Sequence, residues 1–276
     1  MCPPATPTEI NLKSMKRVIR VLNEIFFSIL KIKNFWVYLL CRSRSIADKI
    51  VTIKLRNGIS YNIEPGKNQA PMIKEIWHLN IYDPLLKFVK EGSTIIDIGA
   101  NIGVFSIKAA KKAANVRVFS FEPFPGNFSV LKNNISLNHL DGVIRAFPLA
   151  VDSSLGEKEF FFRPNDSGGG SFRRYGDKSE LLVTTVKTTT LSKIFEENSI
   201  QKCDFIKMDC EGAEEEIILT TPQDLFGLIN SITLEWHADI NKTKIEDFRN
   251  FLETVGYKTE YDHSVITLYA WRESSF

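Results

Sequence analysis

From residue 94 onward, short apolar runs of the chain alternate with stretches whose apolar residues recur at helical spacing. The apolar runs predict strands at 94–98, 116–121, 144–149, 204–209 and 231–236. The helical patterns lie near 103–114, 125–138, 190–198, 213–220 and 242–255, and two more strands are expected near 257–261 and 265–271. Strands that alternate with helices are typical of a doubly wound α/β fold with a mostly parallel sheet.

Before residue 94 the pattern differs. Residues 51–55 and 59–63 alternate between apolar and polar positions around Asn57-Gly58, a strong signal for a β-hairpin. Residues 72–90 have helical spacing with a break at 81–84. The polar, proline-rich residues 1–12 predict a disordered terminus.

Residues 13–41 have the pattern of one helix, in which Lys31 and Lys33 interrupt the apolar run. The uncharged stretch is therefore too short for a transmembrane helix. Three interpretations remain for residues 13–44: a helix packed on the rest of the protein, an interfacial helix on a lipid surface, or an oligomer contact. Packing on the body is the preferred one, and the mixture of Trp, Phe and Lys/Arg favours peripheral membrane contact next.

The charge distribution bears on the same segment. Residues 1–56 hold 11 Lys/Arg and 3 Asp/Glu, a net of +8, which leaves −6 for the other 220 residues because the whole chain carries +2. A basic front on an acidic body indicates either an anionic neighbour or a solvated helix face. We predict two units, a basic, aromatic segment over 1–48 and a main domain over 49–276.

An insertion at 155–189 separates the third and fourth sheet strands. The apolar stretches 159–162 and 182–186 predict a second hairpin. The glycine-rich stretch 168–171 between them predicts a flexible substrate loop beside the sheet.

Composition narrows the class of protein only modestly. The chain is 43% hydrophobic and 25% charged, as ordinary globular proteins are. Its four cysteines lack metal-site spacing and are too scattered for a disulfide framework. The first residues lack the charged-then-apolar order of a secretory signal, so a cytoplasmic protein is expected.

The first sheet strand ends in a loop that indicates a ligand. Asp97 is followed by Gly99, Asn101 and Gly103 in the order D-x-G-x-N-x-G, and a helix begins directly afterwards. Glycines let the backbone approach a ligand closely, and ligands of such sheets bind at the carboxyl ends of the strands. A dinucleotide loop would read G-x-G-x-x-G. An acidic residue here suits a cationic ligand such as S-adenosylmethionine instead.

The second and third strands extend this predicted site. Glu122 follows the second strand about twenty residues after the loop, where a carboxylate accepts hydrogen bonds from ribose hydroxyls. Ala150 and Val151 lie at the end of the third strand, where apolar side chains would sandwich an adenine.

The fourth and fifth strands end in ionisable residues. Asp209 and Glu211 follow one strand, and Glu235 and His237 end the next. Strand alternation places Glu235 and His237 on the same side. A neutral imidazole can take a proton from a hydroxyl, so His237 is the preferred general base, with Glu235 orienting it and Asp209 as the second candidate. Asp209, Glu235 and His237 could also hold a metal ion, although none is expected.

Together these motifs resemble the FkbM-type S-adenosylmethionine-dependent methyltransferases. The motifs that carry the resemblance are Tyr82-Asp83-Pro84, Asp97-Ile98-Gly99-Ala100-Asn101-Ile102-Gly103, Phe121-Glu122-Pro123, the run from Lys207 to Glu214, and Leu234-Glu235-Trp236-His237. The resemblance implies a seven-stranded class I methyltransferase sheet with an antiparallel last strand. It also implies a donor site that includes Tyr82, Ala100, Gly103 and Pro123.

The function expected is methylation of a hydroxyl on a sugar, glycan or natural product, by in-line transfer with a general base. No nucleic-acid partner is expected, and the oligomeric state stays open. Two alternatives are a nicotinamide-dependent oxidoreductase that uses Glu122 on the ribose, and an inactive membrane-associated scaffold of the same fold. The missing G-x-G-x-x-G argues against the first, and the intact ionisable residues argue against the second.

Overall fold

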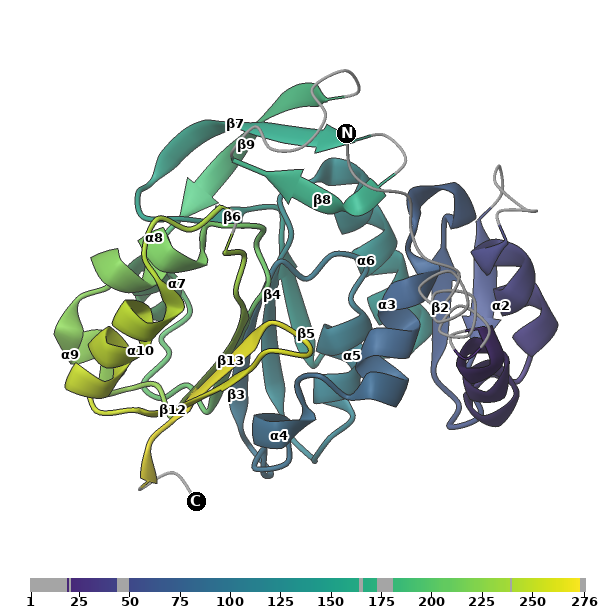
Figure 1. The fold of residues 1–276 in the computed structure, drawn as a ribbon, viewed down its shortest axis with the longest axis horizontal. Coiled ribbons are helices and arrows are strands. Elements are labelled where there is room, and N and C mark those ends of the chain that lie inside the picture. The colour runs from purple at the N-terminus through teal and green to yellow at the C-terminus, as the bar shows by residue number, and fades with distance from the viewer. Residues whose placement is uncertain are drawn as a thin grey trace, which may run out of the picture.

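A seven-stranded sheet forms the centre of the protein (Figure 1). The structure is a computed structural model and describes residues 19, 21–43, 50–163, 166–172, 181–238 and 240–273. The prediction for residues 1–12 lies outside these residues. The strands are β3 (Thr94–Ile98), β4 (Arg117–Phe121), β5 (Ile144–Phe147), β10 (Phe205–Met208), β11 (Ser231–Glu235), β12 (Lys258–Asp262) and β13 (Thr267–Trp271). Their order across the sheet is β12-β13-β11-β10-β3-β4-β5.

The sheet confirms the predicted α/β class. β3 pairs in parallel with β4 and β10, and β5 and β11 continue the parallel ladder on either side. The last strand, β13, is antiparallel to β11 and to β12. This is the expected arrangement, with one antiparallel strand at the end of the chain.

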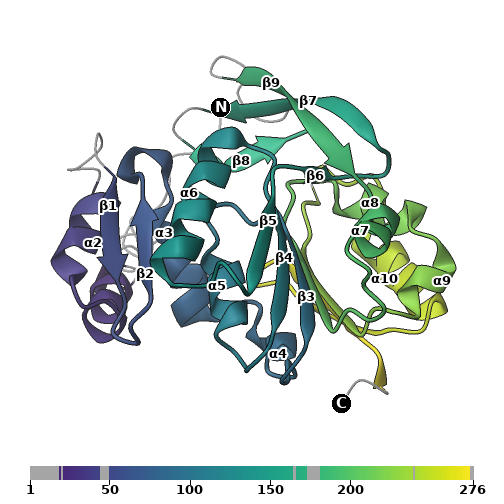
Figure 2. The same ribbon diagram turned by 180° about the vertical axis from the view of Figure 1, so that it is seen from behind.

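Helices cover both faces of the sheet (Figures 1 and 2). One layer contains α5 (Val104–Ala110) and α6 (Pro125–Leu137), and the other contains α7 (Leu191–Glu197), α8 (Glu214–Thr220), α9 (Gln223–Phe226) and α10 (Ile245–Thr254). Successive residues of β3 bury into opposite layers, Ile95 into the first hydrophobic core and Ile96 into the second. A strand buried on both faces reads as a continuous apolar run, which is why β3 matches its predicted range.

The third strand is shorter than predicted. Its ladder with β4 ends at Phe147, and Pro148 separates it from β6 (Ala150–Val151). β6 belongs to a second sheet with the order β6-β9-β7-β8. The prediction of one strand over 144–149 is therefore wrong, because Pro148 lacks an N–H for the ladder.

The insertion forms most of this second sheet. β7 (Gly156–Arg163) pairs antiparallel with β9 (Leu182–Thr189), which confirms that the two apolar stretches pair. They do not form the predicted hairpin, because a further strand lies between them along the chain. The glycine-rich stretch forms β8 (Asp166–Ser171) rather than a flexible linker. β8 pairs with β7, and Gly170 packs so closely on Phe160 that an added Cβ would lie 2.5 Å from its ring.

The N-terminal segment is not the single helix predicted over 13–41. Residues 21–31 are helical, Ile32 bridges to Leu55, and α2 (Phe35–Arg42) follows. The Asn34 amide donates to Thr52 O (2.8 Å) and its side-chain oxygen accepts from the N–H of Lys54 (2.8 Å). These bonds tie the break to β1 (Val51–Lys54), which forms the predicted hairpin with β2 (Ser60–Ile63).

This segment packs on the main body. Phe27, Ile32 and Tyr38 are buried in the same hydrophobic core as β1, β2 and α5. The Glu24 carboxylate accepts from the Tyr38 hydroxyl and pairs with Lys74 (2.6 Å) on α3 (Ala70–Lys74). The boundary at residue 48 stays a prediction.

Between β2 and β3 the chain forms short helical elements, as predicted for 72–90. They are η1 (Pro65–Lys67), α3, the π-helix η2 (Glu75–Leu79) and α4 (Asp83–Leu86). The expected break falls between η2 and α4, where Asn80 has a positive φ of 54°. Among the described residues, no helix is long and apolar enough to cross a membrane.

Candidate active site

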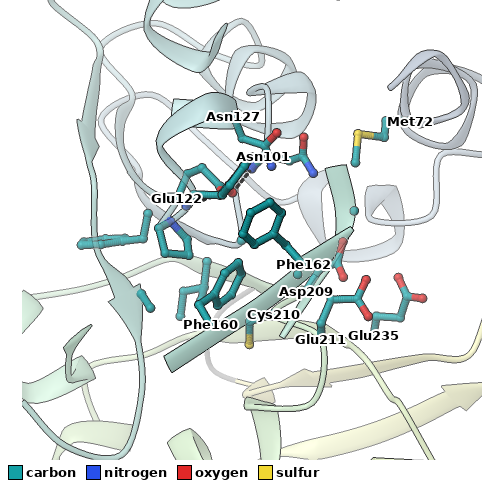
Figure 3. A pocket seen from close by; sticks show the side chains of 18 of the residues that line it. Met72, Asn101, Glu122, Asn127, Phe160, Phe162, Asp209, Cys210, Glu211 and Glu235 are labelled. Carbon is teal, nitrogen blue, oxygen red and sulfur yellow. Dashed lines mark hydrogen bonds between the residues drawn. The ribbon is translucent and has the colours of Figure 1, made fainter. Parts of the chain in front are cut away.

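A pocket lies where β3, β4, β10 and β11 end, with a cavity volume of about 240 Å³. The main sheet supplies its floor, α3 and the start of η2 supply one wall, and the second sheet supplies the opposite wall. Glu122 lies on one side of Phe160 and Phe162, and Asp209, Glu211 and Glu235 lie on the other (Figure 3). The pocket therefore has two polar regions separated by aromatic side chains.

The predicted glycine loop forms part of the floor. Gly99 has a φ of +73°, and an added Cβ would lie 1.8 Å from the main-chain oxygen of Asp209. The two strand ends consequently touch through their backbones, which only glycine permits at this position. Asn101 also has a positive φ (50°), and both Gly99 and Asn101 line the cavity.

Asp97 lies beneath this loop rather than in the cavity. Its side chain is fully buried, accepts from the Ser106 hydroxyl (2.5 Å) and lies 3.4 Å from Lys207 Nζ. Lys207 Nζ in turn donates to Gly99 O (2.7 Å). Asp97 and Lys207 thus form a buried ion pair that supports the loop, and direct donor contact by Asp97 stays a prediction.

Lys207 was not identified from the sequence as a site residue. A lysine inside the apolar run Phe205–Met208 was nevertheless a usable signal, because charged side chains are buried only when they are paired. Burial lowers the pKa of Lys207, but the charges of Asp97 and Asp209 outweigh it and leave the pKa raised. The lysine is therefore a cation under the site.

Glu122 occupies the predicted position directly after β4. Its carboxylate accepts from the N–H groups of Asn101 (2.8 Å) and Phe124 (2.9 Å), and burial raises its pKa to about 7. Glu122 and Pro123 both line the cavity.

Apolar side chains line the space beside Glu122. Ala150 and Val151 are there as predicted, with Phe121 from the floor. Phe160 and Phe162 come from β7, and the rings of Phe162 and Phe124 lie 4.7 Å apart. The two β7 aromatics were not identified from the sequence, although residues two apart in a strand share one face.

The opposite end of the pocket is acidic. Asp209, Glu211 and Glu235 line it together, as predicted, and Glu75 joins them from η2. Burial raises the pKa of Glu75, and the charge of Asp209 raises it further. Glu75 could not be identified from the sequence, because nothing along the chain relates residue 75 to residue 209.

His237 lies behind these carboxylates and does not line the cavity. Its Nε2 is 3.5 Å from Glu211 and 3.7 Å from Glu235, and its Nδ1 is 3.3 Å from Glu214. Burial lowers the pKa of His237, but the hydrogen bond and charge of Glu214 and the charge of Glu211 outweigh it and raise the pKa to about 10. The imidazole is therefore protonated at neutral pH, which disfavours the neutral base expected from the sequence.

Glu214 explains the position of His237. The side chain is fully buried, and its two oxygens accept from the N–H groups of Cys210 (2.9 Å) and Gly212 (2.8 Å). It thereby holds the tight turn after β10, in which Glu211 (φ 55°) and Gly212 (φ 94°) have left-handed conformations. Its role in this turn was not identified from the sequence.

Glu235 is the carboxyl group with the clearest perturbation. Burial and the charge of Asp209 raise its pKa to about 8, although the positive charge of His237 acts in the opposite direction. A carboxyl group with a pKa near the working pH is suited to proton transfer. This makes Glu235, rather than His237, the stronger candidate for a base.

Four predicted donor residues do not line the cavity: Tyr82, Asp97, Ala100 and Gly103. Tyr82 is buried, and its hydroxyl donates to Asp209 Oδ2 at 3.4 Å. Gly103, with a φ of +86°, precedes α5 and packs on Leu131. Their expected roles in donor binding stay predictions.

The acidic end also offers ligand atoms for a metal ion. One ligand atom each of Asp209, Glu211 and His237 lies within 4.8 Å of the others. A metal would have to displace the proton from His237. The absence of a metal stays a prediction.

The strand order and the position of the pocket define an α/β protein with the class I methyltransferase architecture. Residues 97–259 match the family described as "Methyltransferase FkbM domain". The chain belongs to this family and is a methyltransferase.

Individual relatives are distant. Methyltransferase sdnD of Sordaria araneosa is 25% identical over 228 residues, which cover 72% of this chain and 86% of that protein. Hexuronic acid methyltransferase AglP of Haloferax volcanii is 25% identical, covering 61% and 69%. 31-O-demethyl-FK506 methyltransferase FkbM of Streptomyces tacrolimicus is 24% identical, covering 70% and 84%.

The protonated state of His237 gives a testable pH dependence. In His237→Gln, the positive charge that lowers the pKa of Glu235 is lost, so the carboxyl group ionises only at higher pH. If the ionised carboxylate is the base, activity rises at a higher pH than in the wild type and falls roughly tenfold at neutral pH. Profiles of kcat/KM against pH measure this. A loss of about 100-fold at every pH would instead indicate that His237 is the base.

Proposed function

We propose that this methyltransferase uses S-adenosylmethionine to methylate a hydroxyl group on a sugar, glycan or natural-product acceptor. The observation that carries the proposal is the pocket itself, in which Glu122 and a group of four carboxylates are separated by apolar walls. Such a pocket matches a donor with a ribose, a planar aromatic purine and a cationic end.

The residues present suit this donor. Glu122 would accept hydrogen bonds from the ribose hydroxyls, as an acidic residue does in related sheets. Ala150, Val151 and the β7 aromatics would enclose the adenine, and the carboxylates would stabilise the cationic end. The close backbone contact between Gly99 and Asp209 brings the two strand ends together at the floor of the pocket.

The donor supplies an activated methyl group, so the protein mainly has to align the acceptor and remove its proton. We infer that Glu235 accepts this proton. The carboxylate lines the cavity with Asp209 and Glu211, and His237 lies behind it as a cation. Asp209 is the second candidate, since it lines the same region and contacts Tyr82.

The charge of the pocket bears on the acceptor. Four carboxyl groups face one end of the cavity, two of them (Glu75 and Glu235) with raised pKa values, whereas the cations Lys207 and His237 lie outside its lining. An anionic acceptor would be repelled, so a neutral hydroxyl compound is favoured over a uronate. Two curated relatives are named for a hexuronic acid and for FK506, which supports a small-molecule or sugar acceptor.

Ligand binding tests the donor assignment. S-Adenosylhomocysteine is expected to raise the unfolding temperature of the wild type, whereas NAD has no effect. In Glu122→Ala the affinity for S-adenosylhomocysteine should fall roughly tenfold or more, because the ribose loses a charged hydrogen-bond acceptor. Calorimetry measures the affinity.

Glu157→Ala is a matched control, because Glu157 is an exposed glutamate on β7. Stabilisation by NAD instead would favour the oxidoreductase alternative. Binding of S-adenosylhomocysteine with no turnover on a panel of sugar and natural-product acceptors would favour the inactive scaffold.

A cytoplasmic location and the absence of a nucleic-acid partner remain predictions from the sequence. Peripheral membrane contact through residues 13–44 also remains a proposal. The exposed apolar side chains of that segment indicate which residues would make the contact.

A further inference from the structure

Residues 21–31 form a helix with one side buried against the body and an apolar side exposed. Phe27 and Ser28 are fully buried against the body. The other side exposes six large apolar side chains: Val21, Leu22, Ile25, Phe26, Ile29 and Leu30. At 100° per residue these six positions fall within one half of the helix surface.

The exposure is large for side chains of this kind. Phe26 is 61% exposed and Leu22 is 59% exposed. On α2, Trp36 is 60% exposed and Leu40, one turn later, is 38% exposed. Monomeric proteins seldom expose so many apolar side chains together, and such patches mark binding surfaces.

The two helices form one end of the molecule, next to β1 and β2 (Figures 1 and 2). They are held together by Phe27 and Tyr38, whose ring centroids lie 5.7 Å apart, and by Glu24, which pairs with Arg42. We call the eight exposed apolar side chains of residues 21–40 the N-terminal apolar face. It is built on a packed core and so has a defined position on the body.

The charges around this face are almost all positive. Lys33, Lys54 and Arg56 are exposed, and Arg56 Nε donates to Ile29 O (3.0 Å) on the helix that carries most of the face. Within residues 21–43 and 50–56, Glu24 is the single acidic residue, and its side chain is 13% exposed and pairs with Arg42 and Lys74. The surroundings of the face are therefore cationic.

We propose that the N-terminal apolar face binds an anionic lipid membrane surface, with Phe26 and Trp36 inserted among the headgroups and the lysines on the lipid phosphates. Apolar side chains bordered by Lys/Arg, with an exposed Trp, are typical of helices that lie in the membrane interface. A second copy of this chain fits less well, because a twofold contact through the face would bring its cations together. The proposal does not depend on the methyltransferase function.

Sedimentation of the full chain with vesicles tests the proposal. The protein is expected to sediment with vesicles that contain phosphatidylglycerol, less with phosphatidylcholine vesicles, and less at high salt. Phe26→Glu/Trp36→Glu should weaken binding at least about tenfold, because the variant lacks the two large apolar side chains that would be transferred from water into the membrane. Lys33→Gln/Arg56→Gln should weaken it roughly tenfold on anionic vesicles alone.

Leu155→Glu/Leu182→Glu is the matched control, because these side chains are 59% and 49% exposed on the second sheet and its connections. It should bind vesicles like the wild type. The unfolding temperature of each variant shows whether the fold is intact. The proposal is overturned if the wild type binds no vesicle, or if the double glutamate variant binds as well as the wild type. It is also overturned if light scattering shows a dimer that the same variant dissociates.

Discussion

Replacing Glu235 with glutamine is expected to lower kcat at least about 100-fold while leaving the affinity for S-adenosylhomocysteine near that of the wild type. The amide keeps the size of the side chain but cannot accept a proton, and loss of a general base has effects of this size. In the wild type, kcat/KM should rise with pH toward the raised pKa of Glu235, about 8, because the carboxyl group must lose its proton to act. This rise should disappear in Glu235→Gln.

A matched control for this variant is Glu260→Gln, an exposed glutamate on β12 of the same sheet. It should retain wild-type kinetics. If Glu235→Gln kept near-normal turnover while Asp209→Asn lost it, the proton acceptor would be Asp209. Turnover that survived in both variants would exclude Glu235 and Asp209 as the base.

Replacing Lys207 with methionine is expected to destabilise the protein by about 3–5 kcal/mol, the range for removing one partner of a buried ion pair. Asp97 would be left fully buried without its cation, and Gly99 O would lose a hydrogen bond. Denaturant unfolding measures the loss of free energy. The loop that carries Gly99 should also bind S-adenosylhomocysteine more weakly.

The double variant Asp97→Asn/Lys207→Met tests the cause. If the loss comes from an uncompensated carboxylate, the double variant should be more stable than Lys207→Met, with a favourable coupling energy between the two changes. Lys202→Met is the control, because Lys202 pairs with Asp204 at the surface and has a 63% exposed side chain. It should change stability by less than about 1 kcal/mol. A Lys207→Met protein as stable as this control would contradict the assignment.

The central sheet was predictable because its strands are buried on both faces. Runs such as Thr94–Ile98 are apolar without interruption, and glycine or proline residues follow several of them. The break at Ile32–Asn34 was not predictable in the same way. It depends on hydrogen bonds from Asn34 to Thr52 and Lys54, about twenty residues away along the chain.

The residues of the candidate site likewise fall into those that local patterns predict and those that depend on contacts distant in the chain. Asp209, Glu211, Glu235 and Glu122 could be named because strand ends of a parallel sheet meet at one edge. The contribution of Glu75 and of the β7 aromatics depends on how the π-helix and the second sheet pack over that edge, which no local pattern encodes. The role of Glu214 depends on the tight turn that it holds.

Local patterns along the chain were thus sufficient to predict the parallel strands and the strand ends that line the pocket. These predictions follow from short-range rules: apolar periodicity, glycine conformations and the direction of parallel strands. The family and the antiparallel last strand were inferred instead from the resemblance of whole motifs to the FkbM-type methyltransferases. Protonation and exposure were decided only in three dimensions. Whether His237 is a base or a cation depends on three carboxylates that surround it, and whether Phe26 faces a core or the solvent depends on which side of its helix the body covers.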